Sequence, residues 1–460
     1  MATISDLSAP LITHIFSFTS AKDCCRALCA QKAWRVALED DRLWKTFCRE
    51  EYALKSPLAF KRQQLPTYRQ AFLDWKDSIG RYGSLGERAA VAWQKIEDVL
   101  AQQHPSILAS LRPGAEEEDL DKLSQRLGMP IPDAFRVVYR FHDGQQFAPP
   151  FAFWGLFGWF NVYHAVHSTS MLPLKKICLL LHDDSKAIFC SASPEAFQED
   201  GGPLDRTDNE HVGSILEHRQ MCVAMSSGDV FTFANRVGTC ANAGLLLAGD
   251  TGSDHVLRWF EAYATALNTG YFQMGDGWDL VREDYGEVEA LARVPRDAFK
   301  GISIIPRLPP GQVEACTRGI KVSASVVILP DNPMSRSVTV HEYAYSIRFT
   351  LLPVEEQLRL SPQAQPLTSA QLLSRHWVIL DERGQCTDTV EGEAVIGKYP
   401  HLTQDKPTFE YQSCTNLPLG SHGAMAGHFT FVEGTIANPT GPAFDVQCPR
   451  FYLTVPEWIF

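Results

Sequence analysis

In about the last 150 residues, short runs of alternating apolar and polar side chains limit the fold more than any other feature of the chain. Glycine, proline, aspartate and asparagine separate the runs at nearly regular intervals. Successive side chains of a strand point to opposite faces, so this alternation indicates strands with one buried face. We therefore predict an all-β, antiparallel sandwich over residues 310–458. Its apolar runs are Ile320–Leu329, Tyr345–Leu351, Trp377–Leu380, Phe444–Val446 and Phe451–Val455.

The first 50 residues have helical spacing instead. One apolar stripe passes through Leu7, Leu11, Ile15 and Phe18, and a second continues through Leu28, Trp34 and Trp44. Three short helices bury little apolar surface by themselves, so a neighbour is expected to complete their core.

The middle of the chain combines helical patterns with short strand patterns. Residues 51–112 continue as helix, which predicts an all-α linker. Short strands and helices then alternate, with a strand expected at Lys176–Leu181 and an amphipathic helix at His255–Leu267. We expect an α+β domain over residues 113–300. A chain of 460 residues is long enough for two to three domains, so the fold class is multidomain.

Composition excludes some classes of partner. The net charge is −12 and no basic run offsets it, which argues against nucleic acid as a partner. No uninterrupted apolar stretch is long enough to span a membrane, and no signal peptide is visible. The twelve dispersed cysteines are typical of free thiols in a reducing compartment. We expect a cytoplasmic or nuclear protein.

One segment imitates a phosphate-binding loop. Gly392 to Lys398 has the spacing G-x-x-x-x-G-K, but Tyr399 stands where a magnesium-binding Ser or Thr is needed. Pro400 then prevents a helix from opening towards a phosphate, and Glu393 would repel one. The segment is better interpreted as a turn between strands.

Other chemical motifs are weak. Only Cys25 and Cys29 of the early cysteines share a helix face, and no partner pair with zinc spacing follows. No nucleophile motif occurs, so we predict a non-catalytic protein without cofactor or metal. The aromatic run Phe151–Phe160 leaves two interpretations open, a buried strand and turn or an exposed recognition patch.

Residues 317–458 resemble an ApaG domain, a small immunoglobulin-like β-sandwich. Two positions depart from that family: Ala394 replaces a glycine of the G-x-G turn, and Gln404–Pro407 replaces a Pro-Gly-Glu turn. The first departure argues against a ligand role for the turn, because the closest backbone approach needs glycine. The matching segments are Tyr343–Ile347, Leu373–Trp377, Glu391–Gly397, Phe409–Ser413, Gly423–Gly427 and Pro449–Phe451.

Two further resemblances complete the order of domains. Residues 113–270 are similar to the SUKH-like superfamily. The matching part runs from Leu120 to Gln145 and includes Pro130-Ile-Pro-Asp133 and His142-Asp-Gly144. Residues 3–50 resemble an F-box through Pro10–Phe18, Ala27–Trp34 and Asp41–Trp44, although Leu7-Ser8 replaces its opening Leu-Pro and Thr19 replaces a leucine. The order F-box, helical linker, SUKH-like domain and ApaG domain resembles the plant SKIP-type F-box proteins and their animal F-box-only relatives.

This resemblance implies the substrate-recognition subunit of a Skp–cullin–F-box ubiquitin ligase, which binds a Skp-type adaptor and, through it, a cullin. The SUKH-like and ApaG domains would present an unidentified target protein. The alternative is a non-catalytic scaffold with a degenerate F-box, whose sandwich binds a protein or a small anion. The adaptor-binding residues implied are Leu7, Pro10, Leu11, Ile15, Phe18, Leu28, Trp34 and Trp44.

Overall fold

We describe the fold from a computed structural model of the chain. It describes residues 7–30, 34–127, 130–146, 155–162, 165–177, 179–181, 219–225, 230–232, 254–276, 300–329, 340–418, 420–456, 458 and 460. The chain divides into two compact units. The N-terminal unit comprises residues 1–102, 111–144 and 249–265, and the C-terminal unit comprises residues 103–110, 145–248 and 266–460.

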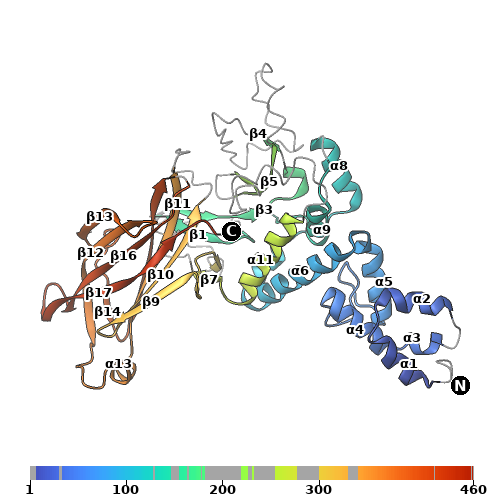
Figure 1. Cartoon of the computed structure of the whole chain (residues 1–460), viewed down its shortest axis with the longest axis horizontal. Coiled ribbons are helices and arrows are strands. Elements are labelled where there is room, and N and C mark those ends of the chain that lie inside the picture. Colours follow the sequence, from blue (N-terminus) through green and yellow to red (C-terminus); the bar gives the residue numbers. More distant parts are fainter. Residues whose placement is uncertain are drawn as a thin grey trace, which may run out of the picture. The chain divides into compact units, whose positions relative to one another are not determined.

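The N-terminal unit begins with α1 (Ala9–Phe16), α2 (Ala21–Ala30), α3 (Arg35–Leu38) and α4 (Asp41–Tyr52), drawn in blue in Figure 1. Pro10 lies in the first turn of α1, where a helix needs no backbone N–H donor. Asp40 caps α4, because its carboxylate accepts a hydrogen bond from the Arg42 backbone N–H at 3.0 Å. These helices confirm the helical pattern predicted for the first 50 residues.

More helices enclose an aromatic core in this unit. They are α5 (Tyr68–Ile79), η3 (Gly80–Tyr82), α6 (Ser84–Gln103), α8 (Glu117–Leu127), α9 (Asp133–Phe141) and α11 (His255–Asn268). The Phe72 ring lies 5.3 Å from that of Trp44 and 5.4 Å from that of Tyr52, measured between centroids. Arg136 is buried but ion-paired, with its Nη2 2.6 Å from an Asp121 carboxylate oxygen, so its charge is compensated.

The C-terminal unit holds α7 (Pro105–Ser110), η4 (Leu174–Lys176) and two small sheets. One sheet has the order β2-β1-β8-β7, from β1 (Trp159–Val162), β2 (Ala165–Ser168), β7 (Gln273–Asp276) and β8 (Lys300–Ser303). In the other, β5 (Arg219–Met225) pairs with β3 (Ser170–Met171), β4 (Leu179–Leu181) and β6 (Val230–Thr232).

The described residues of the aromatic run Phe151–Phe160 belong to the hydrophobic core. Leu156, Phe157 and Trp159 are buried, which supports the interpretation as buried strand and turn for these residues. Phe151–Trp154 lie outside the described residues.

A β-sandwich makes up the rest of the C-terminal unit, in orange and red in Figure 1. One sheet has the order β15-β11-β10-β9, from β9 (Gln312–Thr317), β10 (Ile320–Leu329), β11 (Val340–Leu351) and β15 (Thr408–Pro418). The other has the order β13-β12-β16-β17, from β12 (Ser369–Asp381), β13 (Cys386–Glu393), β16 (Gly423–Gly434) and β17 (Pro439–Leu453). The short β14 (His401–Thr403) pairs with β12, and α13 (Val354–Leu360) connects β11 to β12. The predicted all-β sandwich is confirmed.

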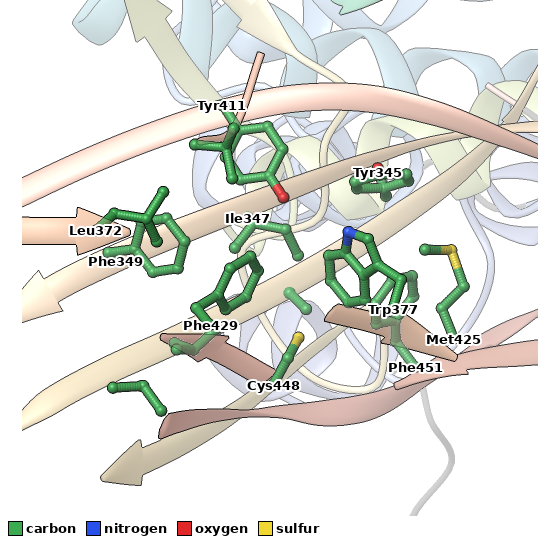
Figure 2. Close-up of a cluster of buried hydrophobic side chains, with 14 of the residues drawn as sticks. Tyr345, Ile347, Phe349, Leu372, Trp377, Tyr411, Met425, Phe429, Cys448 and Phe451 are labelled. Atoms are coloured by element: carbon green, nitrogen blue, oxygen red, sulfur yellow. The ribbon is translucent and has the colours of Figure 1, made fainter. Parts of the chain in front are cut away.

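Aromatic side chains from both sheets fill the sandwich (Figure 2). The rings of Phe349 on β11 and Phe429 on β16 meet edge to face, with centroids 4.6 Å apart. The Trp377 ring on β12 also meets the Phe429 ring edge to face, with centroids 5.2 Å apart. Such contacts add to the free energy gained by burying the rings, so these residues hold the two sheets together.

None of the helices within the described residues combines the length and apolar content that crossing a bilayer requires.

Candidate functional site

Helix α1 exposes large apolar side chains on one face. Ile12 is 4% exposed and packs inward, whereas Leu11 is 45%, Ile15 39% and Phe18 78% exposed. Leu11, Ile15 and Phe18 are separated by four and three residues, so they follow one face of a helix and the turn after it. Large apolar side chains gathered on one exposed face are typical of a surface that binds a partner.

Helix α3 adds an exposed residue that the sequence analysis missed. Val36 is 69% exposed, whereas the next two side chains, Ala37 and Leu38, are buried. The Thr13 hydroxyl donates to the Ala37 carbonyl at 3.0 Å and thereby links α1 to α3. We call Leu11, Ile15, Phe18 and Val36 the exposed apolar set.

The other predicted adaptor-binding residues are placed differently. Pro10 is exposed and Leu7 is half-buried. Trp34 is half-buried, and its ring meets that of Phe16 edge to face at 5.6 Å. Leu28 belongs to α2, but its side chain lies outside the described residues.

Trp44 has to be removed from this set. Its side chain is fully buried against Phe47 and Phe72, and its indole N–H donates to the Leu38 carbonyl at 2.6 Å. A partner could reach Trp44 only if α4 and α5 separated. The prediction that Trp44 contacts an adaptor is therefore wrong, and the residue stabilises the chain's own core instead.

The described residues near α1 offer apolar surface rather than reactive groups. Burial raises the pKa of the Cys24 thiol, which keeps this cysteine protonated and a poor nucleophile. Within the described ranges, no group of three or more His, Cys, Asp or Glu side chains could hold a metal ion. What α1 and α3 offer a partner is apolar area.

Residues 394–400 form a turn between β13 and β14, and Gly392 and Glu393, which the sequence placed in this turn, are the last residues of β13. The amides of Val395 and Lys398 donate to each other's carbonyl oxygens at 3.0 and 2.8 Å. The Arg375 guanidinium also donates to the carbonyls of Glu393 and Ala394 at 2.9 and 2.8 Å. Since these amides are engaged within the turn, they do not form a phosphate cradle.

Comparison with known families defines the class of protein. Residues 9–50 match the F-box-like model, and residues 332–433 match the ApaG domain model. The chain thus has a segment that matches an F-box-like domain near its N-terminus and an ApaG domain in its C-terminal unit. Neither match reaches the middle of the chain, so the SUKH-like domain and the boundaries 3–50, 51–112, 113–300 and 310–458 stay predictions.

Three relatives are similar to the chain over most of their own length. The chain is 29% identical to F-box protein SKIP16 of Arabidopsis thaliana, over 98% of both chains. It is 24% identical to human F-box only protein 3, over 98% of this chain and 85% of the relative. Protein ApaG of Rhodopseudomonas palustris is 31% identical over 31% of this chain and 93% of its own length.

Proposed function

We propose that the chain is the substrate-recognition subunit of a Skp–cullin–F-box ubiquitin ligase and binds a Skp-type adaptor through the exposed apolar set. The observation that carries this proposal is the solvent exposure of Leu11, Ile15 and Phe18 within the segment that matches an F-box-like domain. These side chains are the ones that a second set of helices would cover.

The energetics favour such an interface. Fully burying one Leu, Ile or Phe side chain contributes about 1.5–3 kcal/mol. Leu11 and Ile15 are already about half covered, so each would contribute about 1 kcal/mol on binding and the more exposed Phe18 somewhat more. The remainder of an interface of about 800 Å² per partner would come from Val36, Pro10, Leu7 and neighbouring polar residues.

The remainder of the chain would present the target. In this proposal the SUKH-like domain and the ApaG sandwich hold a protein near the ubiquitin-charged enzyme that the cullin recruits. The receptor itself makes and breaks no bonds, because its contribution is a raised effective concentration of the target. Such a receptor would act in the cytoplasm, the nucleus or both.

Co-purification of the full-length chain with a Skp-type adaptor tests the proposal. The double variant Leu11→Asp/Ile15→Asp places two charges on the exposed face and should abolish co-purification. Leu358→Asp/Leu360→Asp is a matched control, because these leucines on α13 are 38% and 55% exposed but lie outside the F-box-like segment. Retained co-purification of the first variant would contradict the proposal. Target binding without any adaptor would favour a scaffold instead.

A further inference from the structure

Helix α3 lies beside α1 (Figure 1) and is too short to be held in place by its own hydrogen bonds. It has four residues, and the backbone carbonyls at the end of a helix need partners from outside it. The Thr13 hydroxyl on α1 donates to the Ala37 carbonyl at 3.0 Å, which the Asp40 backbone N–H approaches only to 3.4 Å. The Trp44 indole N–H on α4 donates to the Leu38 carbonyl at 2.6 Å. The position of α3 therefore depends on side chains of its neighbours.

The Thr13 hydroxyl reaches beyond its own helix. Its oxygen lies 3.0 Å from the Ala9 carbonyl oxygen, four residues earlier in α1, and also 3.0 Å from the Ala37 carbonyl oxygen in α3. The first contact is usual for a threonine inside a helix, whereas the second connects two helices. Among the described residues, the Thr46 hydroxyl on α4 has the first kind of contact alone, to the Arg42 carbonyl at 3.2 Å. Thr13 therefore joins α1 to α3, and Thr46 offers a matched comparison.

Thr13 does not belong to the face of α1 that a partner would cover. Two residues of an α-helix turn by about 200°, so Thr13 points to the side of α1 opposite Leu11 and Ile15. Its side chain is half-buried, whereas those of Leu11 and Ile15 are exposed. Any effect of Thr13 on the binding of a partner must therefore act through α3.

The residue that α3 presents to a partner is Val36. Its side chain is exposed, while those of Ala37 and Leu38 next to it are buried. Val36 belongs to the exposed apolar set together with residues from α1 and the turn after it, so a partner that covers the whole set must meet both helices at once. Joining the two helices before binding reduces the conformational entropy that binding has to overcome.

We propose that Thr13 is a positioning residue of the adaptor surface. Its hydroxyl fixes α3 on α1 and so holds Val36 in place relative to the other members of the exposed apolar set before the adaptor binds. The identity of the partner rests on the proposed function. The connection between α1 and α3 is a property of the free chain and can be measured without an adaptor.

The first measurement uses the free full-length chain. Thr13→Val keeps the branched shape of the side chain but removes the hydroxyl, whereas Thr13→Ser keeps the hydroxyl. The Glu39 backbone N–H donates to the Arg35 carbonyl, so its hydrogen exchange reports on the integrity of α3. This exchange should be roughly 3- to 10-fold faster in Thr13→Val, the change expected for the loss of one hydrogen bond. Thr13→Ser and the control Thr46→Val should exchange at the wild-type rate, and unchanged exchange in Thr13→Val would overturn the proposal.

The second measurement is the affinity of the same full-length variants for a purified Skp-type adaptor, determined by calorimetry. Thr13→Val should raise Kd roughly 3- to 10-fold, whereas Thr13→Ser and Thr46→Val should keep the wild-type Kd. In a Val36→Ala background, Thr13→Val should have a smaller effect on Kd, because both changes act through α3.

Two results of the binding measurement would overturn the proposal. One is a wild-type Kd for Thr13→Val in spite of its faster hydrogen exchange, and the other is an effect of Thr13→Val that is equally large with and without Val36. Failure of the wild-type chain itself to bind the adaptor would contradict the proposed function and, with it, this role of Thr13. The wild-type titration thus distinguishes failure of the proposed function from failure of the positioning role alone.

Discussion

Leu11 and Ile12 are neighbours in α1 but face opposite environments, with 45% of Leu11 and only 4% of Ile12 exposed. Ile12 belongs to the core that α1 shares with its own chain, whereas Leu11 belongs to a face that the described residues leave open. The free energy of folding should therefore depend on Ile12, and the free energy of adaptor binding on Leu11.

Substitution of these two residues should separate stability from binding. Ile12→Ala should destabilise the N-terminal helices by about 2–4 kcal/mol, because it leaves a cavity in their small core. Leu11→Ala should change stability by less than about 0.5 kcal/mol. Chemical denaturation followed by circular dichroism measures both. An equal loss of stability in the two variants would show that Leu11 is part of the folded core.

The pH dependence of stability should be altered by Glu51, which lines a cavity of about 280 Å³ with Glu50 and Glu87. Burial, and after it the Glu87 carboxylate, raises the pKa of Glu51 from 4.5 to about 7. The folded chain thus holds a proton that the unfolded chain releases, so this group's contribution to stability falls as pH rises from 4.5 to 7.

Glu51→Gln should therefore match the wild type near pH 4.5 and exceed its stability by roughly 1 kcal/mol at pH 7.5, allowing for partial solvent exposure. Denaturation curves at four pH values measure this difference. Glu382→Gln is the control for the loss of one negative charge, since Glu382 is exposed and does not line this cavity. A stability difference between Glu51→Gln and the wild type that stays constant with pH would contradict the prediction.

The sandwich should depend on the close strand approach at Gly427. A β-carbon added there would lie 2.0 Å from the His376 carbonyl oxygen on β12, so the strands would have to separate. Gly427→Ala should lower stability by about 2–4 kcal/mol. Gly441→Ala is the control, because its β-carbon would meet first the side-chain oxygen of Glu433, which can rotate away. Thermal unfolding of both variants measures the contrast, and equal melting temperatures would refute it.

Sequence patterns predicted the parts of the molecule that local spacing determines. The sandwich followed from alternation, and the exposed face of α1 followed from the helical spacing of Leu11, Ile15 and Phe18. Trp44 was misassigned because a helical stripe does not reveal which helix will cover it, and α5 supplies that cover through Phe72. Val36 was missed because one valine in a four-residue helix forms no stripe.

The contact between Trp377 on β12 and Tyr411 on β15 could not be predicted from the sequence. The two residues lie on different sheets, and only the packing of the sheets turns their polar atoms towards one another. The turn at residues 394–400 could be predicted from the sequence, because Tyr399 and Pro400 ruled out a phosphate-binding loop. The hydrogen bonds by which Arg375 anchors this turn appear only in the folded chain.

The central claim is that the exposed face of α1 binds a Skp-type adaptor. Its most direct test is the dissociation constant of the full-length chain and a purified adaptor, measured by calorimetry for the wild type and for Leu11→Ala/Phe18→Ala. We predict that the double variant raises Kd by at least about 10-fold while its unfolding curve is unchanged. Leu360→Ala on α13 should leave Kd unaltered. A wild-type Kd for Leu11→Ala/Phe18→Ala would contradict the account.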